Sequence, residues 1–437
     1  MKRKYYIAGI LLLICLLFSG CGKKGEDVAI VEQRDFKLLK TVCLESMPLR
    51  NEPGFNSRIV ETLYPQAELE WLGEIVEVGG TEFYHVRVLE SGNEGYCSAK
   101  YCILVDYEYV EEALRYVESD DAVYSYEMMV EDLNILAKKY PDRFTISSLG
   151  NSAEGRKIYQ AVLGNPSAET AVFIQAGIHG REYMCTQLVM KMLEYYTLYY
   201  HVGSYREIPY TQLFDNVCFY VIPMSNPDGI SISQFGESAV KDETRREMLQ
   251  QSYDREKKIG NYNTTAYEEY LIQWKANANG VDLNRNFNAQ WEKIEGKTNP
   301  SSDAYKGNAP ESEPETQVLI DAVRQRKFSY IVNYHARGQI IYYDVKGNSE
   351  EMANASYQLA LLFQEQNQYE PVNCKDSSSV TLGGFGDWVM LSEQIPSITI
   401  EIGKNSCPLE ILEFASIWIR NRETWGKLAW EIIEAKN

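Results

Sequence analysis

Three segments far apart in the chain carry side chains that could hold a metal ion and use it. They are residues 179–182 (HGRE), the isolated His335, and Glu401 inside an apolar run. Two neutral imidazoles and one carboxylate are good zinc ligands, and they leave the fourth tetrahedral position to water. A further carboxylate nearby can take the proton of that water. We therefore predict that His179, Glu182 and His335 hold one zinc ion, and that Glu401 is the general base of a hydrolase.

Each candidate lies at or near the carboxyl end of an apolar run that is rich in strand-forming residues. These runs cover 171–178, 217–224, 329–334 and 397–402, and helical patterns lie between or after them at 185–200, 353–366 and 409–435. Such alternation is typical of an α/β fold with helices on both faces of a sheet. In open α/β sheets the site lies just beyond the carboxyl ends of the strands. The four runs are therefore expected to meet at one edge.

Length and charge limit the classes of protein that remain. With 437 residues, 45% of them hydrophobic, the chain is expected to form two folded units. A net charge of −19 argues against nucleic acid as a partner, because phosphate binding needs clustered cations. Outside residues 1–21 seven cysteines remain, and their odd number and scattered positions do not form a disulfide framework. We expect most of them to be buried thiols.

The amino terminus has the pattern of an export signal. A basic start at 2–4 (KRK) precedes an apolar stretch over 5–18 that is short for a membrane-spanning helix. Residues 17–21 (LFSGC) resemble the lipobox of bacterial lipoproteins, although Phe18 replaces the usual leucine. The resemblance implies a signal peptide over 1–20, lipidation of Cys21, a tether over 21–30 and a place on the extracellular face of the bacterial cell membrane. An ordinary cleaved signal and an uncleaved anchor are the alternatives.

Residues 31–106 show brief alternating runs broken by turn residues, which predicts a small all-β barrel. Two segments, 47–53 (MPLRNEP) and 95–101 (GYCSAKY), resemble the bacterial SH3 domain. The resemblance implies a module that binds the cell wall, and the alternative is a spacer. An acidic linker over 107–121 follows, and the catalytic domain is expected over 122–437.

The catalytic part resembles the M14 zinc carboxypeptidase family over nearly all of residues 122–437. The resemblance depends on the joint occurrence, in family order, of 148–156 (SLGNSAEGR), 177–182 (GIHGRE), 226–229 (NPDG), 280–287 (GVDLNRNF), 334–335 (YH) and 399–401 (TIE). It implies a mixed open sheet with helices on both faces, a single zinc ion and the activity of a metallocarboxypeptidase.

Several site residues follow from this resemblance. Asn284 and Arg285 match the family's pair for the terminal carboxylate of the substrate, a task that suits the planar fork of arginine. Arg181 matches a position lining the cleft. Lys275 stands where many members carry an arginine that polarises the scissile carbonyl. A lysine supplies the positive charge but lacks the paired N–H donors of a guanidinium group.

Departures from the family pattern concern the substrate pocket. Digestive members carry a tyrosine a few residues before 383–388 (GGFGDW), whereas 377–382 has none, so a closing hydroxyl is in doubt. Gly386 occupies a position whose side chain helps to choose the terminal residue, and a glycine favours a roomy pocket. Arg337 follows the third ligand where small polar residues are usual, and we hypothesise that it contacts a second carboxylate of the substrate.

The segment 274–277 (WKAN), together with 401–403 (EIG) and the following 408–409 (PL), is similar to the branch that hydrolyses γ-D-glutamyl-diaminopimelate bonds in cell-wall peptides. We therefore expect a surface-anchored zinc peptidase that acts on peptidoglycan stem peptides. One alternative is a general metallocarboxypeptidase that releases C-terminal L-amino acids. Another is a wall-binding lipoprotein without activity, which the complete set of ligands and Glu401 disfavours.

Overall fold

The computed structural model describes residues 37–41, 46–64, 67–89, 91–105, 123–201, 203–206, 208–261, 265–375 and 382–436. The predicted signal peptide, Cys21, the tether and the linker over 107–121 lie outside the described residues, as does the segment 377–381 that lacks a tyrosine. Among the helices that are described, none has the length and apolar character needed to cross a membrane.

The amino-terminal part is a seven-stranded antiparallel sheet in the order β3-β2-β6-β5-β4-β1-β7. Strands β4 and β5 are joined by the two-residue turn Gly79 and Gly80, both with positive φ, which matches the right-handed twist of a hairpin. The alternating apolar residues face one small core. This arrangement is compatible with an SH3-like part. The strands are β1 (Lys37–Thr41), β2 (Met47–Arg50), β3 (Ile59–Leu63), β4 (Glu68–Val78), β5 (Thr81–Val88), β6 (Glu94–Ser98) and β7 (Cys102–Val105).

The larger sheet has eight strands in the order β16-β15-β17-β14-β10-β13-β9-β8. Its four central strands, β17, β14, β10 and β13, are parallel, and antiparallel pairing of β9 with β13 and of β15 with β17 makes the sheet mixed. The mixed sheet predicted from the sequence is thus confirmed. The strands are β8 (Phe144–Asn151), β9 (Lys157–Leu163), β10 (Thr170–Ala176), β13 (Val217–Ile222), β14 (Tyr330–Ala336), β15 (Ile340–Asp344), β16 (Glu370–Asn373) and β17 (Ser397–Ile402), and the separate short pair is β11 (Ser204–Tyr205) and β12 (Ile208–Pro209).

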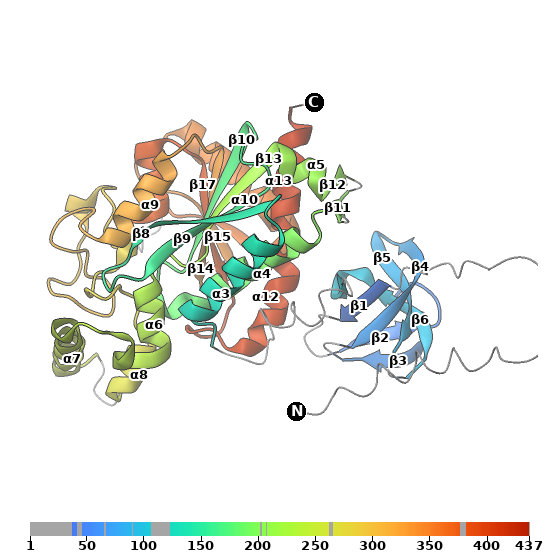
Figure 1. Cartoon of the computed structure of the whole chain (residues 1–437), viewed down its shortest axis with the longest axis horizontal. Helices are drawn as coiled ribbons and strands as arrows, with labels where there is room; N and C mark the ends of the chain where they lie inside the picture. Colours follow the sequence, from blue (N-terminus) through green and yellow to red (C-terminus); the bar gives the residue numbers. More distant parts are fainter. Residues whose placement is uncertain are drawn as a thin grey trace, which may run out of the picture. The chain divides into compact units, whose positions relative to one another are not determined.

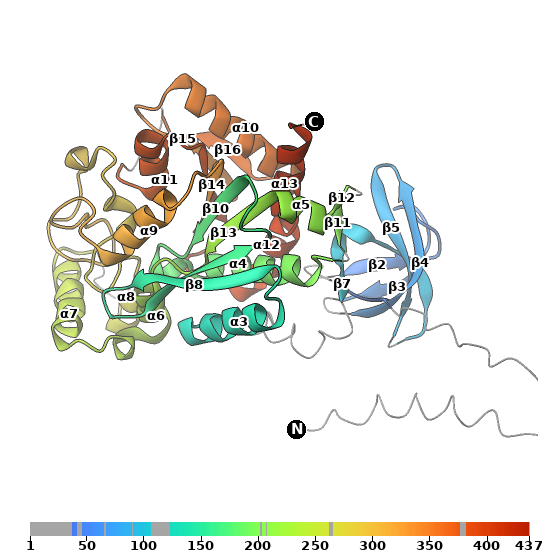
Figure 2. The ribbon, with the colours of Figure 1, turned by 45° about the horizontal axis from the view of Figure 1, so that its top comes forward.

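Helices cover both faces of this sheet, and the labels in Figures 1 and 2 allow them to be followed. Val172 and Ile174 of β10 belong to one core, whereas Ala171 and Phe173 of the same strand belong to another, as the two-residue period of a strand requires. The first core includes α3 (Tyr126–Lys139), α4 (Tyr183–Leu198), α5 (Tyr210–Asn216), α10 (Glu350–Asn367), α12 (Phe414–Asn421) and α13 (Thr424–Glu434), and the second includes α9 (Pro314–Arg324) and α11 (Phe385–Trp388).

The predicted helical stretches are confirmed, except that one of them forms two helices instead of one. Residues 185–200 correspond to α4 and 353–366 to α10, while 409–435 form two helices, α12 and α13. The segment 236–270, whose sequence is polar and charged, is mostly helical in its described residues. It contains α7 (Glu243–Lys258) and α8 (Tyr267–Ile272), which pack with α6 (Pro227–Phe235) around a small core of their own. The apolar face of α7 is narrow, because only Leu249 and Tyr253 among its large apolar residues are buried. The sequence of this helix therefore shows little apolar periodicity.

Among the described cysteines, Cys97, Cys102, Cys185 and Cys218 are buried, as expected for most of them.

Candidate active site

The structure brings His179, Glu182 and His335 together. Their ligand atoms lie within 4.8 Å of one another. His179 Nδ1 is 2.8 Å from Glu182 Oε1, and His335 Nδ1 is 3.1 Å from Glu182 Oε2. The two Nδ1 atoms are 3.2 Å apart. All three side chains are buried.

The local sequence explains how residues three apart can face one point. Gly177, at φ +65°, turns the chain out of β10, and a Cβ there would lie 2.6 Å from Thr186 Oγ1. Gly180 opens the 3₁₀ turn η3 (Gly180–Glu182), where a Cβ would lie 2.4 Å from the Gly229 carbonyl oxygen. Only glycine allows this close approach of backbone to backbone. The strand end is thereby held against α6, and both ligands point to the same place.

Glu401 stands beside this cluster because of strand register. It is the direct partner of His335 across the parallel strands β17 and β14, so their side chains leave the sheet on the same face. Burial raises the pKa of Glu401 to about 7; the charge of His335 opposes this rise, whereas that of Glu182 adds to it. A carboxyl group with a pKa near neutrality can both accept and return a proton.

The Glu182 carboxylate is held in its ionised form. Burial raises its pKa, but the charges of His179 and His335 and their hydrogen bonds outweigh burial and hold the pKa well below its usual value. The Ala336 backbone N–H also donates to Glu182 Oε2, at 3.2 Å. An ionised, well-oriented carboxylate is the form that binds a cation.

Asp282 supports the cluster from behind. Its Oδ1 lies 3.3 Å from His179 Nε2, the ring nitrogen that faces away from the other ligands. Burial raises the Asp282 pKa, but Lys275, His179 and Arg285 outweigh it and keep the pKa well below its usual value. A carboxylate on the far nitrogen of a ligating histidine fixes its tautomer and orientation. Sequence reasoning assigned no role to Asp282, although it stands in the same motif as Asn284 and Arg285.

The two residues predicted to hold a terminal carboxylate differ in placement. Asn284 lines the cavity, and its Oδ1 accepts a hydrogen bond from the Phe385 backbone N–H at 2.9 Å. Arg285 is not among the residues that line the cavity. Its Nε lies 3.7 Å from Asp282 Oδ2 and is buried without a hydrogen-bond partner. Arg285 thus follows Asn284 outside the cavity lining, and its Nε donates no hydrogen bond.

The other predicted side chains line one cavity of about 570 Å³ together with the three clustered residues and Glu401. Arg181 donates to Gln273 Oε1 at 3.4 Å, and its Nε is buried without a hydrogen-bond partner. Lys275 follows the buried Trp274, and its carbonyl oxygen accepts from the Gly180 N–H at 3.0 Å. Arg337 is exposed at the rim and donates to the Lys404 carbonyl oxygen at 3.3 Å.

Gly386 lies where the cavity meets the sheet. A Cβ at this position would lie 3.3 Å from both Asn333 Nδ2 and Thr399 Oγ1, so any side chain would reduce the space in front of these strands. The roomy pocket expected from this glycine stays a prediction.

Further cavity residues carried no assignment from the sequence. They are polar for the most part and include Tyr342, Asp344, Cys374, Asp387 and Cys407. Asp387 follows Gly386 directly, so its position in the motif was a usable signal. Burial raises its pKa to about 6. Asp344 and Cys374 lie at the ends of β15 and β16, and only the order of strands in the sheet brings them to the cavity.

The three clustered residues fit a zinc ion by donor type, since two imidazole nitrogens and a carboxylate oxygen form a catalytic zinc set. The contact between the two Nδ1 atoms supports this interpretation, because a shared cation gives both nitrogens an electron-pair acceptor. Glu401 lies beside the set as an additional carboxylate.

Comparisons with known proteins agree with the geometry. A model of the zinc carboxypeptidase family matches residues 129–424. The chain is 29% identical over 299 residues to gamma-D-glutamyl-L-diamino acid endopeptidase 1 of Lysinibacillus sphaericus, an alignment that covers 68% of this chain and 69% of the relative. It is 30% identical over 275 residues to carboxypeptidase B of Rattus norvegicus, covering 58% of this chain and 56% of that protein.

Solved structures share the fold. Bovine thrombin-activatable fibrinolysis inhibitor, in complex with a tick carboxypeptidase inhibitor, superimposes with a TM-score of 0.54 at 19% identity, covering 71% of this chain and 98% of that one. Carboxypeptidase A from Helicoverpa armigera gives a TM-score of 0.52 at 19% identity, with 79% of this chain and 89% of that one covered.

Proposed function

Because this chain belongs to the zinc carboxypeptidase family, and is therefore a metallopeptidase, we propose that it hydrolyses peptidoglycan stem peptides at γ-D-glutamyl-diaminopimelate type bonds. The observation that carries this proposal is the charged lining of the cavity beside the clustered ligands, which contains Asp344, Asp387 and Arg337. The relative from Lysinibacillus sphaericus, which is named for a bond of this kind, supports the same assignment.

The reaction is assigned to residues of known position. His179, Glu182 and His335 would hold one zinc ion, which supplies Lewis acidity and a more acidic water when bound. Glu401 accepts the proton of the attacking water and returns it to the departing amine. Its raised pKa, about 7, suits both halves of this transfer.

Positioning of the substrate falls to the cations and amides of the cavity. Lys275 places one positive charge near Glu401, and it stabilises negative charge that develops on the scissile carbonyl oxygen. Asn284, which lines the cavity, receives the terminal carboxylate, and the charge of Arg285 next to it favours an anion there. Arg181 lines the same cleft and helps to hold the peptide.

The wall of the pocket favours a side chain with charges of its own. The diaminopimelate side chain ends in an ammonium group and a carboxylate. Asp344 and Asp387 offer acceptors to the ammonium group, and Arg337 at the rim offers a donor to the carboxylate. A cavity selective for large apolar residues would be lined by apolar groups instead. Gly386 lines the same cavity and adds no side chain to it.

We also propose that the chain is exported, lipidated at Cys21 and held at the extracellular face of the cell membrane, where the amino-terminal SH3-like part of residues 31–106 meets the cell wall. The basic and apolar pattern of residues 1–21 supports this placement. Metabolic labelling with a radioactive fatty acid checks it: label on the wild-type chain and none on Cys21→Ser is expected, and equal labelling would contradict it.

The second candidate is a general carboxypeptidase, favoured by the 30% identity to carboxypeptidase B. The purified, zinc-loaded full chain should be offered a γ-D-glutamyl-diaminopimelate peptide and an ordinary L-peptide, with the released amino acids measured by chromatography. Release of diaminopimelate at a rate well above that of the L-amino acid is expected. The reverse preference would favour the second candidate. The Glu401→Gln variant controls for a contaminating peptidase.

A further inference from the structure

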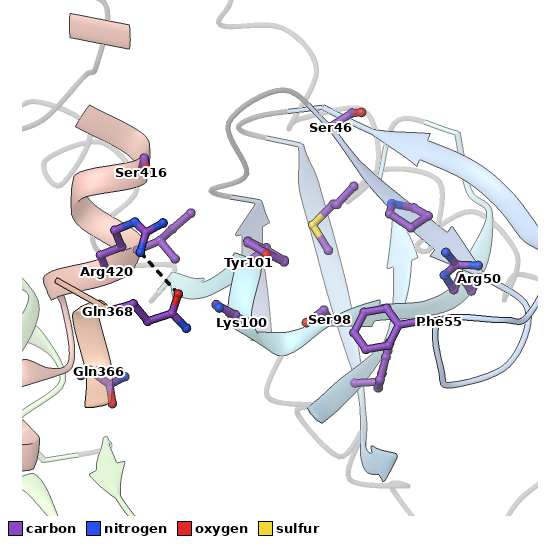
Figure 3. Close-up of a pocket in the computed structure, with 14 residues that line it drawn as sticks. Ser46, Arg50, Phe55, Ser98, Lys100, Tyr101, Gln366, Gln368, Ser416 and Arg420 are labelled. Carbon is purple, nitrogen blue, oxygen red and sulfur yellow. Dashed lines mark hydrogen bonds between the residues drawn. The ribbon is translucent and has the colours of Figure 1, made fainter. Parts of the chain in front are cut away.

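We infer that a second pocket, distinct from the catalytic cavity, binds an acidic peptide. It has a volume of about 530 Å³, and the residues that carry the argument are Arg50, Phe55, Ser98, Lys100, Tyr101 and Arg420. We call it the basic aromatic pocket. Figure 3 shows its side chains, which come from the small sheet and from the region of α10 and α12. It shares no lining residue with the catalytic cavity.

The charge of the basic aromatic pocket is opposite to that of the chain. The protein carries a net charge of −19. Arg50, Lys100 and Arg420 nevertheless line this pocket, and none of the described lining residues is acidic. A local positive surface attracts anions even when the rest of the protein is acidic. Charge complementarity therefore indicates an anionic occupant.

Two buried polar groups in the pocket lack partners. Ser98 is 7% exposed and its hydroxyl oxygen has no hydrogen bond. Arg50 donates through one Nη to the Ser57 carbonyl oxygen, but its Nε is buried without a partner. Buried polar groups are rarely left unpaired, because an unmade hydrogen bond costs the full desolvation of the group. A hydroxyl and a guanidinium N–H at the same pocket are the donors that a carboxylate accepts from.

The pocket also presents aromatic surface. Phe55 is 60% exposed, and its ring packs edge-on against the buried Phe83 with 5.3 Å between ring centroids. Lys100 Nζ lies 5.8 Å from the centroid of the Tyr101 ring. An exposed ring fixed in place by a buried neighbour is typical of a contact that a partner covers.

Together these features specify the ligand. Arginine forks recognise planar carboxylates, and the aromatic and apolar walls suit the side chains that lie between the carboxylates of a peptide. A phosphate polymer would satisfy the cations but would leave the rings uncovered. A peptide of alternating acidic and aromatic residues is accordingly the preferred ligand.

The test is a binding measurement on the full, zinc-loaded chain. The probe is a fluorescent peptide of alternating tyrosine and glutamate, with both ends blocked so that a carboxypeptidase site cannot hold its terminus. Anisotropy should report saturable binding. Lys100→Glu should weaken it by about tenfold and Phe55→Ser by about fivefold. Both residues are exposed, so circular dichroism and thermal midpoints should match those of the wild-type protein.

Matched controls decide the outcome. Arg58→Glu and Tyr64→Ser change an exposed cation and an exposed ring of the same sheet outside the pocket, and they should bind as the wild type does. Weakening in these controls equal to that in Lys100→Glu would overturn the inference. So would equal affinity for a glutamine-substituted peptide, binding of polyphosphate in place of the acidic peptide, or absence of binding at about 1 mM. Because the probe is end-blocked, failure here leaves the proposed peptidase activity unaffected.

Discussion

Glu401 lies directly across the sheet from His335, as its register partner on the neighbouring parallel strand. One residue is a clustered metal-ligand candidate and the other is the proposed base, so the hydrogen-bond register of β14 and β17 sets the distance between metal and base. A slip by one residue would turn either side chain to the opposite face of the sheet.

Glu401→Gln should keep the metal and lose turnover by about 10²- to 10⁴-fold, because the amide cannot accept the proton of water. Zinc content by elemental analysis and kcat on the preferred peptide check this. The exposed Glu410 provides a matched control, and Glu410→Gln should be fully active. Unchanged activity in Glu401→Gln would reject its assignment as the base.

His335→Ala should lose both zinc and activity, since one of the three clustered ligands is removed. The zinc-to-protein ratio after dialysis is the measurement. His201→Ala alters an exposed histidine that is not one of the clustered residues, and it should retain the metal. Stoichiometric zinc in His335→Ala would show that the ligand set is wrong.

Asp282→Asn should weaken zinc affinity by about 10- to 100-fold without removing a ligand, because the carboxylate that orients His179 is lost. Competition with a chelator measures the zinc affinity. If Asp282 only stabilised the fold, the folded variant would bind zinc as tightly as the wild type. Asp321→Asn, at an exposed position of α9, is the control. Equal zinc affinity in both variants would show that Asp282 does not orient His179 for metal binding.

The metal-free protein should show a pH dependence that Glu401 causes. Burial raises its pKa from 4.5 to about 7, so the folded state prefers the neutral acid. The resulting stability is complete below pH 4.5 and is lost as the pH rises through about 7. The neutral Glu401→Gln side chain avoids that loss, so this variant should melt higher than the wild type at about pH 8 and equally at about pH 4. Calorimetry with chelator present measures this, and a constant difference at both pH values would contradict it.

Arg337→Ala should lower kcat/KM by about tenfold on substrates whose terminal residue carries a second carboxylate, because a charge-assisted hydrogen bond is lost. Substrates without that carboxylate serve as the matched control and should be cleaved at the wild-type rate. The residue is exposed, so its removal should leave the fold intact. Equal effects on both substrates would remove Arg337 from substrate selection.

Local patterns in the sequence determined which residues form strands. They also determined which strands end at side chains that can bind a metal or accept a proton. The apolar runs that lead to His179, His335 and Glu401 are short-range features, visible because burial on both faces of a parallel strand demands unbroken apolar sequence. The helix α7 has only a weak pattern in the sequence, because only a narrow stripe of its surface is buried.

Tertiary structure alone decided what these elements place side by side. The strand order brought Asp344 and Cys374 to the catalytic cavity, and the turn at η5 (Leu283–Arg285) placed Asp282 behind His179. The basic aromatic pocket drew its residues from two distant segments, within 46–101 and 366–420. Such contacts depend on long-range pairing and on the packing of whole elements. The periodicity of a single segment reports which of its faces is buried, and it carries no information about which distant segment will cover that face.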